Sequence, residues 1–431
     1  MDIKDGSKLD MNRRIKYYHM NKLITILVTI SPILGIYKMP LLPLSIGDFA
    51  FCVSIVISLF INKRKLCIKK NEMLYIHMYF MFILISFLSL IVQNVDFNIS
   101  DFISKISRMI VYAITLDIVV NKSFDIKYAE KLVIKISVFL AGTILVQELG
   151  RLCNIVILPY LNWLPLNYNL SVDELTALTY IRQAGGIWRV SSVFPEPAHY
   201  CYYVLIGLAI LLLQQDIKQS DKFRIVYALL ITISIIISGS AIGFFGSALL
   251  WLVWIGIRLR NRITLSRFLG ISVIVIIGVF LFIESGGLDK AMYRVGTIRS
   301  LTEGSTGGTR LLQGLYVFSQ LDLLHKFIGI GFGNVSFFMI KNTITTPFIK
   351  EIGNEFMNVF STVLVSGGVV SLIYFGINWI RLYISNKIIV AKIIWLVTSI
   401  IFCVSSIFYN CYFVFFVTFI IAYSTIKNNK D

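Results

Sequence analysis

Charged residues are scarce in this sequence. Only 15% of its 431 residues are charged, 57% are hydrophobic, and the mean hydropathy is +0.80. A typical soluble domain carries about 25% charged residues, because its exterior must face water. So little charge cannot cover a soluble chain of this length, and the composition therefore indicates a membrane protein.

Cysteine and histidine are also few, which bears on cofactors. The six cysteines show neither paired metal spacing nor a disulfide framework, and the four histidines are spread along the chain. A glycine-rich stretch at 303–310 lacks the Gly-Lys-Ser/Thr ending of a nucleotide-binding P-loop. We therefore expect neither a metal nor a cofactor.

Long apolar runs recur from end to end, and each is near the length of about 20 residues that a helix needs to cross a bilayer. The runs are continuous rather than alternating, so helices are favoured over barrel strands. The first run follows a basic leader without a small-residue cleavage site, so we expect it to remain as an anchor. The sequence predicts an all-α polytopic membrane protein with about twelve spans, at approximately 22–38, 41–61, 73–92, 106–120, 132–149, 197–214, 225–238, 241–257, 268–283, 356–380, 393–408 and 411–426. Ser238-Gly239-Ser240 separates the seventh and eighth runs, which could instead form one broken element.

The basic residues indicate an orientation. The net charge is +17, but the lysines and arginines lie between spans rather than on one face, which argues against a nucleic-acid partner. If the N-terminus is cytoplasmic, 26 of the 40 basic residues fall in inner segments. The short outer connections then hold only Lys38, Lys105 and Arg108. The bias predicts that both termini are cytoplasmic.

This topology leaves two long segments on the outer side of a single membrane domain spanning 1–431. They are 150–196 and 284–355. Long loops in a compact protein usually carry function or are disordered, and the aromatic content of these two suggests packing. The second contains amphipathic patterns at 309–326 and 334–341, which predict surface helices. No internal repeat is visible in the chain.

The end of the first outer segment groups a cation, a carboxylate and an imidazole at the entrance of a span: Arg189, Glu196 and His199. Pro195 and Pro197 restrict the backbone on both sides of Glu196. Glu196 should therefore lie at the start of the following helix, where a partial positive charge stabilises an anion. A simpler interpretation is that Glu196 only caps this helix and that Arg189 reaches lipid phosphate.

The second outer segment contains Arg294 and Arg299, followed by a glycine- and hydroxyl-rich turn that leads to Arg310 in the first turn of a helix. Backbone N–H groups and a guanidinium in that arrangement suit a phosphate or pyrophosphate. The alternative is a surface loop with an arginine that reaches lipid headgroups. The glycines of 328–334 predict a tight turn.

A few other ionisable residues lie in or beside the spans. Asp48 is the deepest, but a single acid is weak evidence for proton coupling. Glu148 is placed to pair with Arg151 one turn away. Glu351 and Glu355 precede the tenth span and are expected to cap it rather than to act as a base.

These features together resemble the O-antigen polymerase (Wzy-type) and O-antigen ligase families of bacterial surface-polysaccharide synthesis. The resemblance covers most of the chain through its spans, cytoplasmic ends and two enlarged outer loops. The Arg-x10-Gly pattern of some members is absent from the outer-loop arginines here. The local motifs that carry the resemblance are Arg189-x-x-Ser192-x-Phe194-x-Glu196-Pro197, Ile237-Ser238-Gly239-Ser240-Ala241-Ile242-Gly243, Gly308-Thr309-Arg310 and Phe327-Ile328-Gly329-Ile330-Gly331-Phe332-Gly333-Asn334.

The resemblance implies metal-independent glycosyl transfer on the outer face of the bacterial cytoplasmic membrane. A glycan would pass from polyprenyl pyrophosphate to a sugar hydroxyl of another lipid-linked repeat unit. Glu196 or His199 would accept the hydroxyl proton, and Arg189 and Arg310 would stabilise the leaving group. The arginines implied in pyrophosphate binding are Arg189, Arg294, Arg299 and Arg310.

Implied partners are membrane lipids, a chain-length regulator and a flippase, with no nucleic acid. Two alternatives stay open at this point. A ligase would share the fold and hand finished glycan to a different acceptor. A flippase or transporter for lipid-linked oligosaccharide also suits twelve spans, although such proteins usually show repeated halves and a charged or broken-helix site at the midplane.

Overall fold

The computed structural model describes the chain in segments: 3–40, 44–61, 73–93, 98–161, 164–166, 176–177, 179–181, 189–214, 221–260, 306–349 and 352–428. Within these residues the secondary structure is helical, and extended pairing is limited to isolated bridges at Tyr37–Leu166 and Lys38–Ser45. The predicted all-α class is therefore confirmed. The predicted ninth run, 268–283, lies outside the described residues.

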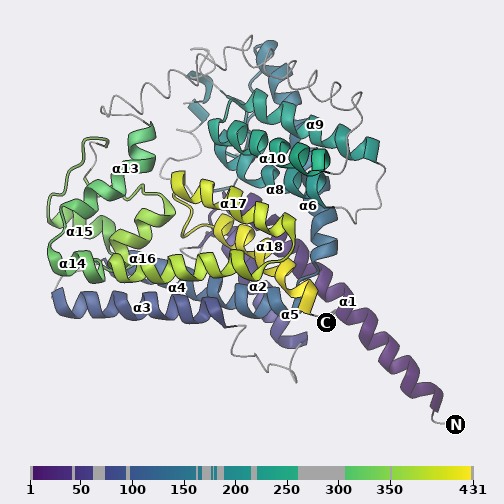
Figure 1. Ribbon diagram of the computed structural model, residues 1–431, viewed down its shortest axis with the longest axis horizontal. Helices are drawn as coiled ribbons and strands as arrows, with labels where there is room; N and C mark the ends of the chain where they lie inside the picture. The colour runs from purple at the N-terminus through teal and green to yellow at the C-terminus, as the bar shows by residue number, and fades with distance from the viewer. Residues whose placement is uncertain are drawn as a thin grey trace.

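A helix overlaps each of the other predicted apolar runs (Figure 1). In chain order the described helices are α1 (Ile3–Leu34), α2 (Ile46–Ile61), α3 (Leu74–Gln93), α4 (Ile99–Ile114), the π-helical η2 (Thr115–Val120), α5 (Asn121–Ser123), α6 (Ile126–Leu152), α8 (Pro197–Leu213), α9 (Asp221–Ser238), α10 (Ala241–Arg260), α13 (Thr306–Ser319), α14 (Leu323–Ile328), α15 (Val335–Lys341), α16 (Val359–Ser385), α17 (Ile389–Val404) and α18 (Cys411–Asn428). The helix α1 starts before the predicted first run, because it continues backward through the polar leader, and it projects from the bundle. The predicted break at Ser238-Gly239-Ser240 is confirmed, since α9 ends and α10 begins there.

Four described helices are long and apolar enough to cross a membrane: α3, α6, α10 and α16. The exposed face of α16 is an apolar stripe at helical spacing, made by Val370, Ile373, Ile377, Ile380 and Ile384. Soluble proteins rarely expose continuous apolar surface of this kind, whereas lipid tails match it. The protein is therefore embedded in a membrane through its apolar helices.

The helix α8 lies at the centre of the bundle and contacts α6, α9, α10, α17 and α18. Its residues from Tyr200 to Leu213 are all buried, as expected for a helix that is apolar on every side. Glycines allow this close packing: a Cβ at Gly207 would lie 2.2 Å from the Ser137 hydroxyl, and one at Gly243 would lie 2.3 Å from the Cys201 sulfur. Small residues at such contacts are typical of helices that pack in membranes. The packing fixes the position of the N-terminal end of α8.

The helix α16 is broken at Gly368, where φ is +68° and ψ is −173°. Residues of the glycine-rich segment after α14 pair with the carbonyls beside the break. The Ile330 N–H donates to the Val365 carbonyl at 3.1 Å, and the Gly331 N–H donates to the Ser366 carbonyl at 2.9 Å. Polar backbone in an apolar surrounding must find such partners, so the break and the segment stabilise each other.

The predicted tight turn at 328–334 is confirmed, because Gly329, Gly331 and Gly333 all have positive φ values. Two serines of α3 anchor this turn. Ser89 donates to the Gly329 carbonyl at 2.9 Å, and the Phe332 N–H donates to the Ser86 hydroxyl at 2.9 Å. The turn thus connects α3 to the break in α16.

The predicted amphipathic stretch 309–326 forms two helices, α13 and α14, rather than one. Asp322 ends the gap between them by capping α14: its carboxylate accepts the His325 N–H at 2.8 Å, which lowers the pKa of Asp322. The His325 ring also packs 5.1 Å from the Phe338 ring of α15, between centroids. The prediction of a helix at 334–341 is confirmed by α15.

Candidate functional site

Three of the residues singled out from the sequence come together where the N-terminal end of α8 meets α13. The Arg310 guanidinium, from α13, lies 3.9 Å (Nη2 to Oε2) from the Glu196 carboxylate, and the two side chains are 25% and 51% exposed. His199 follows Glu196 by one helical turn on α8. Segments more than a hundred positions apart in the sequence therefore place a cation, a carboxylate and an imidazole in one solvent-accessible site.

Arg310 is held from three directions. Its Nη1 donates to the Val404 carbonyl at the end of α17 at 3.3 Å. Its own carbonyl accepts from the Asn358 side chain at 3.0 Å, and the Phe356 ring centroid lies 5.5 Å from its guanidinium carbon. A guanidinium fixed in this way still has N–H groups available for an anionic ligand.

The sequence suggested that Arg310 lies in the first turn of its helix, but the structure places it further along. The helix α13 begins at Thr306, so Gly307, Gly308 and Thr309 belong to it, and Arg310 is one residue beyond its first turn. The expected glycine-rich turn in front of Arg310 is therefore wrong for these residues. Tertiary packing accounts for the difference: α13 lies against α16, and Gly314 approaches it so closely that a Cβ there would lie 2.2 Å from the Ser361 side chain.

Glu196 is the N-cap residue of α8, with Pro197 as the first helical residue. Its backbone carbonyl accepts the N–H groups of His199 at 3.1 Å and Tyr200 at 3.3 Å. Among the described residues no backbone N–H donates a capping hydrogen bond to the Glu196 carboxylate. The carboxylate faces Arg310, so its position at the helix end leaves it available for chemistry.

His199 is flanked by two tyrosine rings, with centroid distances of 5.6 Å to Tyr202 and 5.4 Å to Tyr412. The Tyr412 hydroxyl donates to the His199 carbonyl at 3.1 Å, and the Tyr202 hydroxyl bonds to Ser405. Ser405 and Tyr412 belong to the turn between α17 and α18 and to its margins. That turn therefore fixes the orientation of the first turn of α8.

Arg189 takes a different place. Its Nη1 donates to the Gly239 carbonyl at 3.3 Å, in the turn between α9 and α10, and its side chain is exposed. Gly239 adopts a φ of +62°, a conformation that favours glycine. Arg189 is therefore close to Glu196 in the sequence but does not take part in the ion pair between Glu196 and Arg310. Arg294 and Arg299 lie outside the described residues.

Sequence reasoning missed Gln147 of α6, which holds the segment that leads to Glu196. Its side-chain oxygen accepts the N–H groups of Ser191 at 3.2 Å and Ser192 at 2.8 Å, and its amide donates to the Ser192 carbonyl at 2.7 Å. Ser192 has a φ of +60°, a conformation that needs such support. A glutamine inside a predicted apolar span was the available signal. The predicted Glu148–Arg151 pair, one residue further on, is confirmed by contacts of 2.8 and 2.6 Å.

Asp48 is a buried hub at the start of α2. Its carboxylate accepts from the Tyr112 hydroxyl at 2.7 Å and from the Cys411 thiol at 3.3 Å, and it lies 3.2 Å from the Arg108 guanidinium. The Tyr112 hydroxyl also lies 3.2 Å from the Tyr409 carbonyl. The network therefore ties α2 and α4 to the turn that fixes His199. Because Arg108 compensates its charge, Asp48 is part of a positioning network rather than an isolated acid in the membrane.

We expect Asp48→Asn to destabilise the protein by about 3 kcal/mol, because Arg108 would keep a poorly solvated charge without its counterion. Arg108→Gln in the same chain should recover most of this loss, since the pair is then neutral and can still form hydrogen bonds. Thermal unfolding of the single and double variants in detergent measures the coupling. A double variant whose loss equals the sum of the single losses would contradict the charge compensation.

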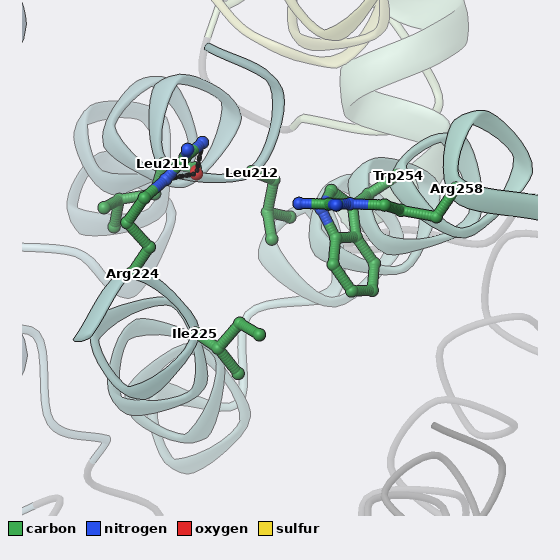
Figure 2. Close-up of a pocket in the computed structure, with 6 residues that line it drawn as sticks. All are labelled: Leu211, Leu212, Arg224, Ile225, Trp254 and Arg258. Carbon is green, nitrogen blue, oxygen red and sulfur yellow. Dashed lines mark hydrogen bonds between the residues drawn. The ribbon is translucent and has the colours of Figure 1, made fainter. Parts of the chain in front are cut away.

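The opposite end of α8 is also basic (Figure 2). Arg224 donates to the Leu211 carbonyl at 2.8 Å and also to Gln214, which satisfies carbonyls at the end of the helix. Arg258 stacks over Trp254 of α10 with 5.6 Å between the guanidinium carbon and the ring centroid. Leu212 and Ile225 complete a shallow depression between these side chains. The contacts of Arg224 therefore show that it caps the C-terminal end of α8.

Comparison with known proteins does not name this site. No model of a known protein family matches the sequence, and no curated protein matches it. The chemistry of the site therefore rests on its side chains. A positioned guanidinium can bind and neutralise a phosphate group, and a neighbouring carboxylate or imidazole can accept a proton from a hydroxyl.

Proposed function

We propose that this protein is a repeat-unit polymerase for a bacterial surface polysaccharide, of the O-antigen or capsule kind. It transfers a glycan from polyprenyl pyrophosphate to a sugar hydroxyl of another lipid-linked repeat unit. The observation that carries the proposal is the 3.9 Å pairing of Arg310 with Glu196. Both residues lie in the motifs that resemble the Wzy-type family, at the end of the first and in the second predicted outer segment.

The roles follow from charge and reach. The acceptor hydroxyl oxygen forms a new bond to the anomeric carbon of the donor glycan, while the bond from that carbon to the phosphate oxygen breaks. Polyprenyl pyrophosphate leaves with the bonding electrons, and Arg310 stabilises the charge that develops on it. Glu196, whose carboxylate is half exposed, accepts the hydroxyl proton, with His199 as the neighbouring alternative base. In this proposal the transfer needs no metal ion.

The proposed topology has about twelve spans, both termini in the cytoplasm and the site at the outer face of the bacterial cytoplasmic membrane. It is supported by the arrangement along α8. Glu196 and His199 are at its N-terminal end, whereas Arg224 contacts its C-terminal end, about 25 Å away for a helix of 17 residues. Basic residues at that second end fit a cytoplasmic surface. Membrane lipids, a chain-length regulator and a flippase are the proposed partners.

The test uses purified protein in liposomes with a lipid-linked repeat unit as the sole substrate. The expected result is a ladder of lengthened glycans together with released polyprenyl pyrophosphate. Movement of intact repeat units across the bilayer without lengthening would show a transporter instead. In a deletion strain, single lipid-linked repeat units should accumulate; accumulation of finished lipid-linked polymer would show a ligase. Either of these two results overturns the polymerase proposal.

A further inference from the structure

The helix α4 carries two cations one helical turn apart, Lys105 and Arg108. They lie in the same part of the protein as the Arg310 site. The Lys105 ammonium bonds to the Glu355 carboxylate and lies 5.5 Å from the centre of the Tyr409 ring. Arg108 pairs with Asp48, as described above. Lys105 is 13% exposed, but its partner Glu355 is 38% exposed, so solvent reaches this pair from the carboxylate side.

The capping role expected for Glu355 is wrong. Asn358 caps α16, accepting the Ser361 N–H at 2.9 Å, and Glu355 turns to Lys105 instead. Glu351 lies outside the described residues. The Glu355 carboxylate is therefore paired with a cation 250 positions away in the sequence rather than with the start of α16.

One short segment connects Lys105 to the Arg310 site. In residues 355–358, Glu355 bonds to Lys105, the neighbouring Phe356 lies under the Arg310 guanidinium, and Asn358 bonds to the Arg310 carbonyl. Tyr409 adds a second connection. Its ring lies beside Lys105, and it belongs to the turn between α17 and α18 that orients His199. The two cationic places are therefore adjacent parts of one surface.

The other face of α4 is apolar and exposed. Ile99, Ile103 and Ile110 follow one another at helical spacing on that face, and Ile91 of the adjoining α3 is 75% exposed. Since the protein is embedded in a membrane, this stripe faces lipid tails. The helix that carries a cation able to hold a phosphate is thus itself in contact with lipid tails on its other side. A lipid pyrophosphate can place its phosphates at the cation and its isoprenoid chain among the surrounding lipid tails, whereas a soluble anion would use the cation alone.

We propose that Lys105 is the centre of a second lipid-pyrophosphate site, which holds the acceptor substrate. This inference rests on the proposed polymerase function, in which two lipid-linked molecules must be bound at once. The pyrophosphate of the acceptor stays intact, so it needs binding but no stabilisation of a leaving group. Lys105 meets that need, whereas Arg310, beside Glu196 and His199, serves the reacting donor. The acceptor pyrophosphate replaces the partly exposed Glu355 on Lys105, while Arg108 stays paired with Asp48.

Binding of sugar-free polyprenyl pyrophosphate to the protein in zwitterionic nanodiscs tests the site directly. The wild type should bind two equivalents, and Lys105→Ala and Arg310→Ala one each. Lys341→Ala, an exposed lysine of α15, is the matched control and should bind two. A wild type that binds one equivalent, lost only in Arg310→Ala, overturns the second site and leaves the polymerase proposal intact. A wild type that binds none overturns the polymerase proposal.

Two further measurements separate the acceptor from other anions. With lipid-linked repeat units, Lys105→Ala should raise the KM for the acceptor by about 10- to 100-fold, the effect of losing one charge-assisted hydrogen bond, and Lys105→Arg should restore it. A KM unchanged in Lys105→Ala overturns the assignment. Nanodiscs that contain phosphatidylglycerol should still bind two equivalents; loss of one there would show a general phospholipid-headgroup site and overturn the proposal.

Discussion

We expect Arg310→Ala to lower the rate of repeat-unit transfer by about 100- to 1,000-fold, the effect typical of removing one donor that stabilises developing negative charge. The guanidinium is held by Val404, Phe356 and the Glu196 carboxylate, so its N–H groups are fixed before the substrate binds. Preorganised groups of this kind cost little reorganisation when charge develops on the leaving pyrophosphate. Arg310→Lys should retain part of the rate, because it keeps the charge but loses the two-pronged geometry.

The measurement is the initial rate of glycan lengthening by purified variants at matched protein amounts. Arg381→Ala is the control, because Arg381 is an exposed arginine near the far end of α16. Its rate should equal that of the wild type. Equal polymer from Arg310→Ala and the wild type would remove Arg310 from the mechanism. If Glu196→Ala also gave full polymer, the assignment of the whole site would fail.

Local features of this protein could be predicted from the sequence because they depend on neighbouring residues. Apolar runs determine where helices form in a membrane, so a helix overlaps each predicted run that lies within the described residues. Glycines that need a positive φ likewise predict their own turns, as at Gly239 and through 328–334. The Glu148–Arg151 pair lies within one helical turn and is equally local.

Contacts between distant segments could not be predicted in the same way. Nothing in the periodicity of α13 or α8 places Arg310 beside Glu196, since their approach depends on how α13 packs against α16 and α17 and how α8 packs against α17. The sequence suggested a helix cap for Glu355 and placed Lys105 only in an outer connection, and only the fold makes them partners. Arg189 shows the opposite effect: it is close to Glu196 in the sequence, yet it bonds to the α9–α10 turn.

The largest effect on stability is expected from a substitution at Gly368, where α16 is broken. We expect Gly368→Ala to destabilise the fold by about 2–6 kcal/mol. Its φ of +68° and ψ of −173° lie in a region essentially reserved for glycine, which costs another residue about 1–3 kcal/mol. A Cβ there would also lie 2.1 Å from the Phe327 carbonyl oxygen, and overpacking of this kind costs about 1–3 kcal/mol.

Gly376→Ala in the same helix is the matched control, since a Cβ at Gly376 has no heavy atom within 4 Å among its described surroundings. That variant should be as stable as the wild type or slightly more so, because alanine favours helix. The Gly368→Ala and Gly376→Ala proteins are compared by their thermal unfolding in detergent, monitored by size-exclusion chromatography. Because Gly368 meets the segment that continues from α14 to the α3 anchor, its loss should also separate α14 from α16 and displace α13 with Arg310. A Gly368→Ala protein with the melting temperature of the Gly376→Ala control would show that α16 can straighten at the break without cost.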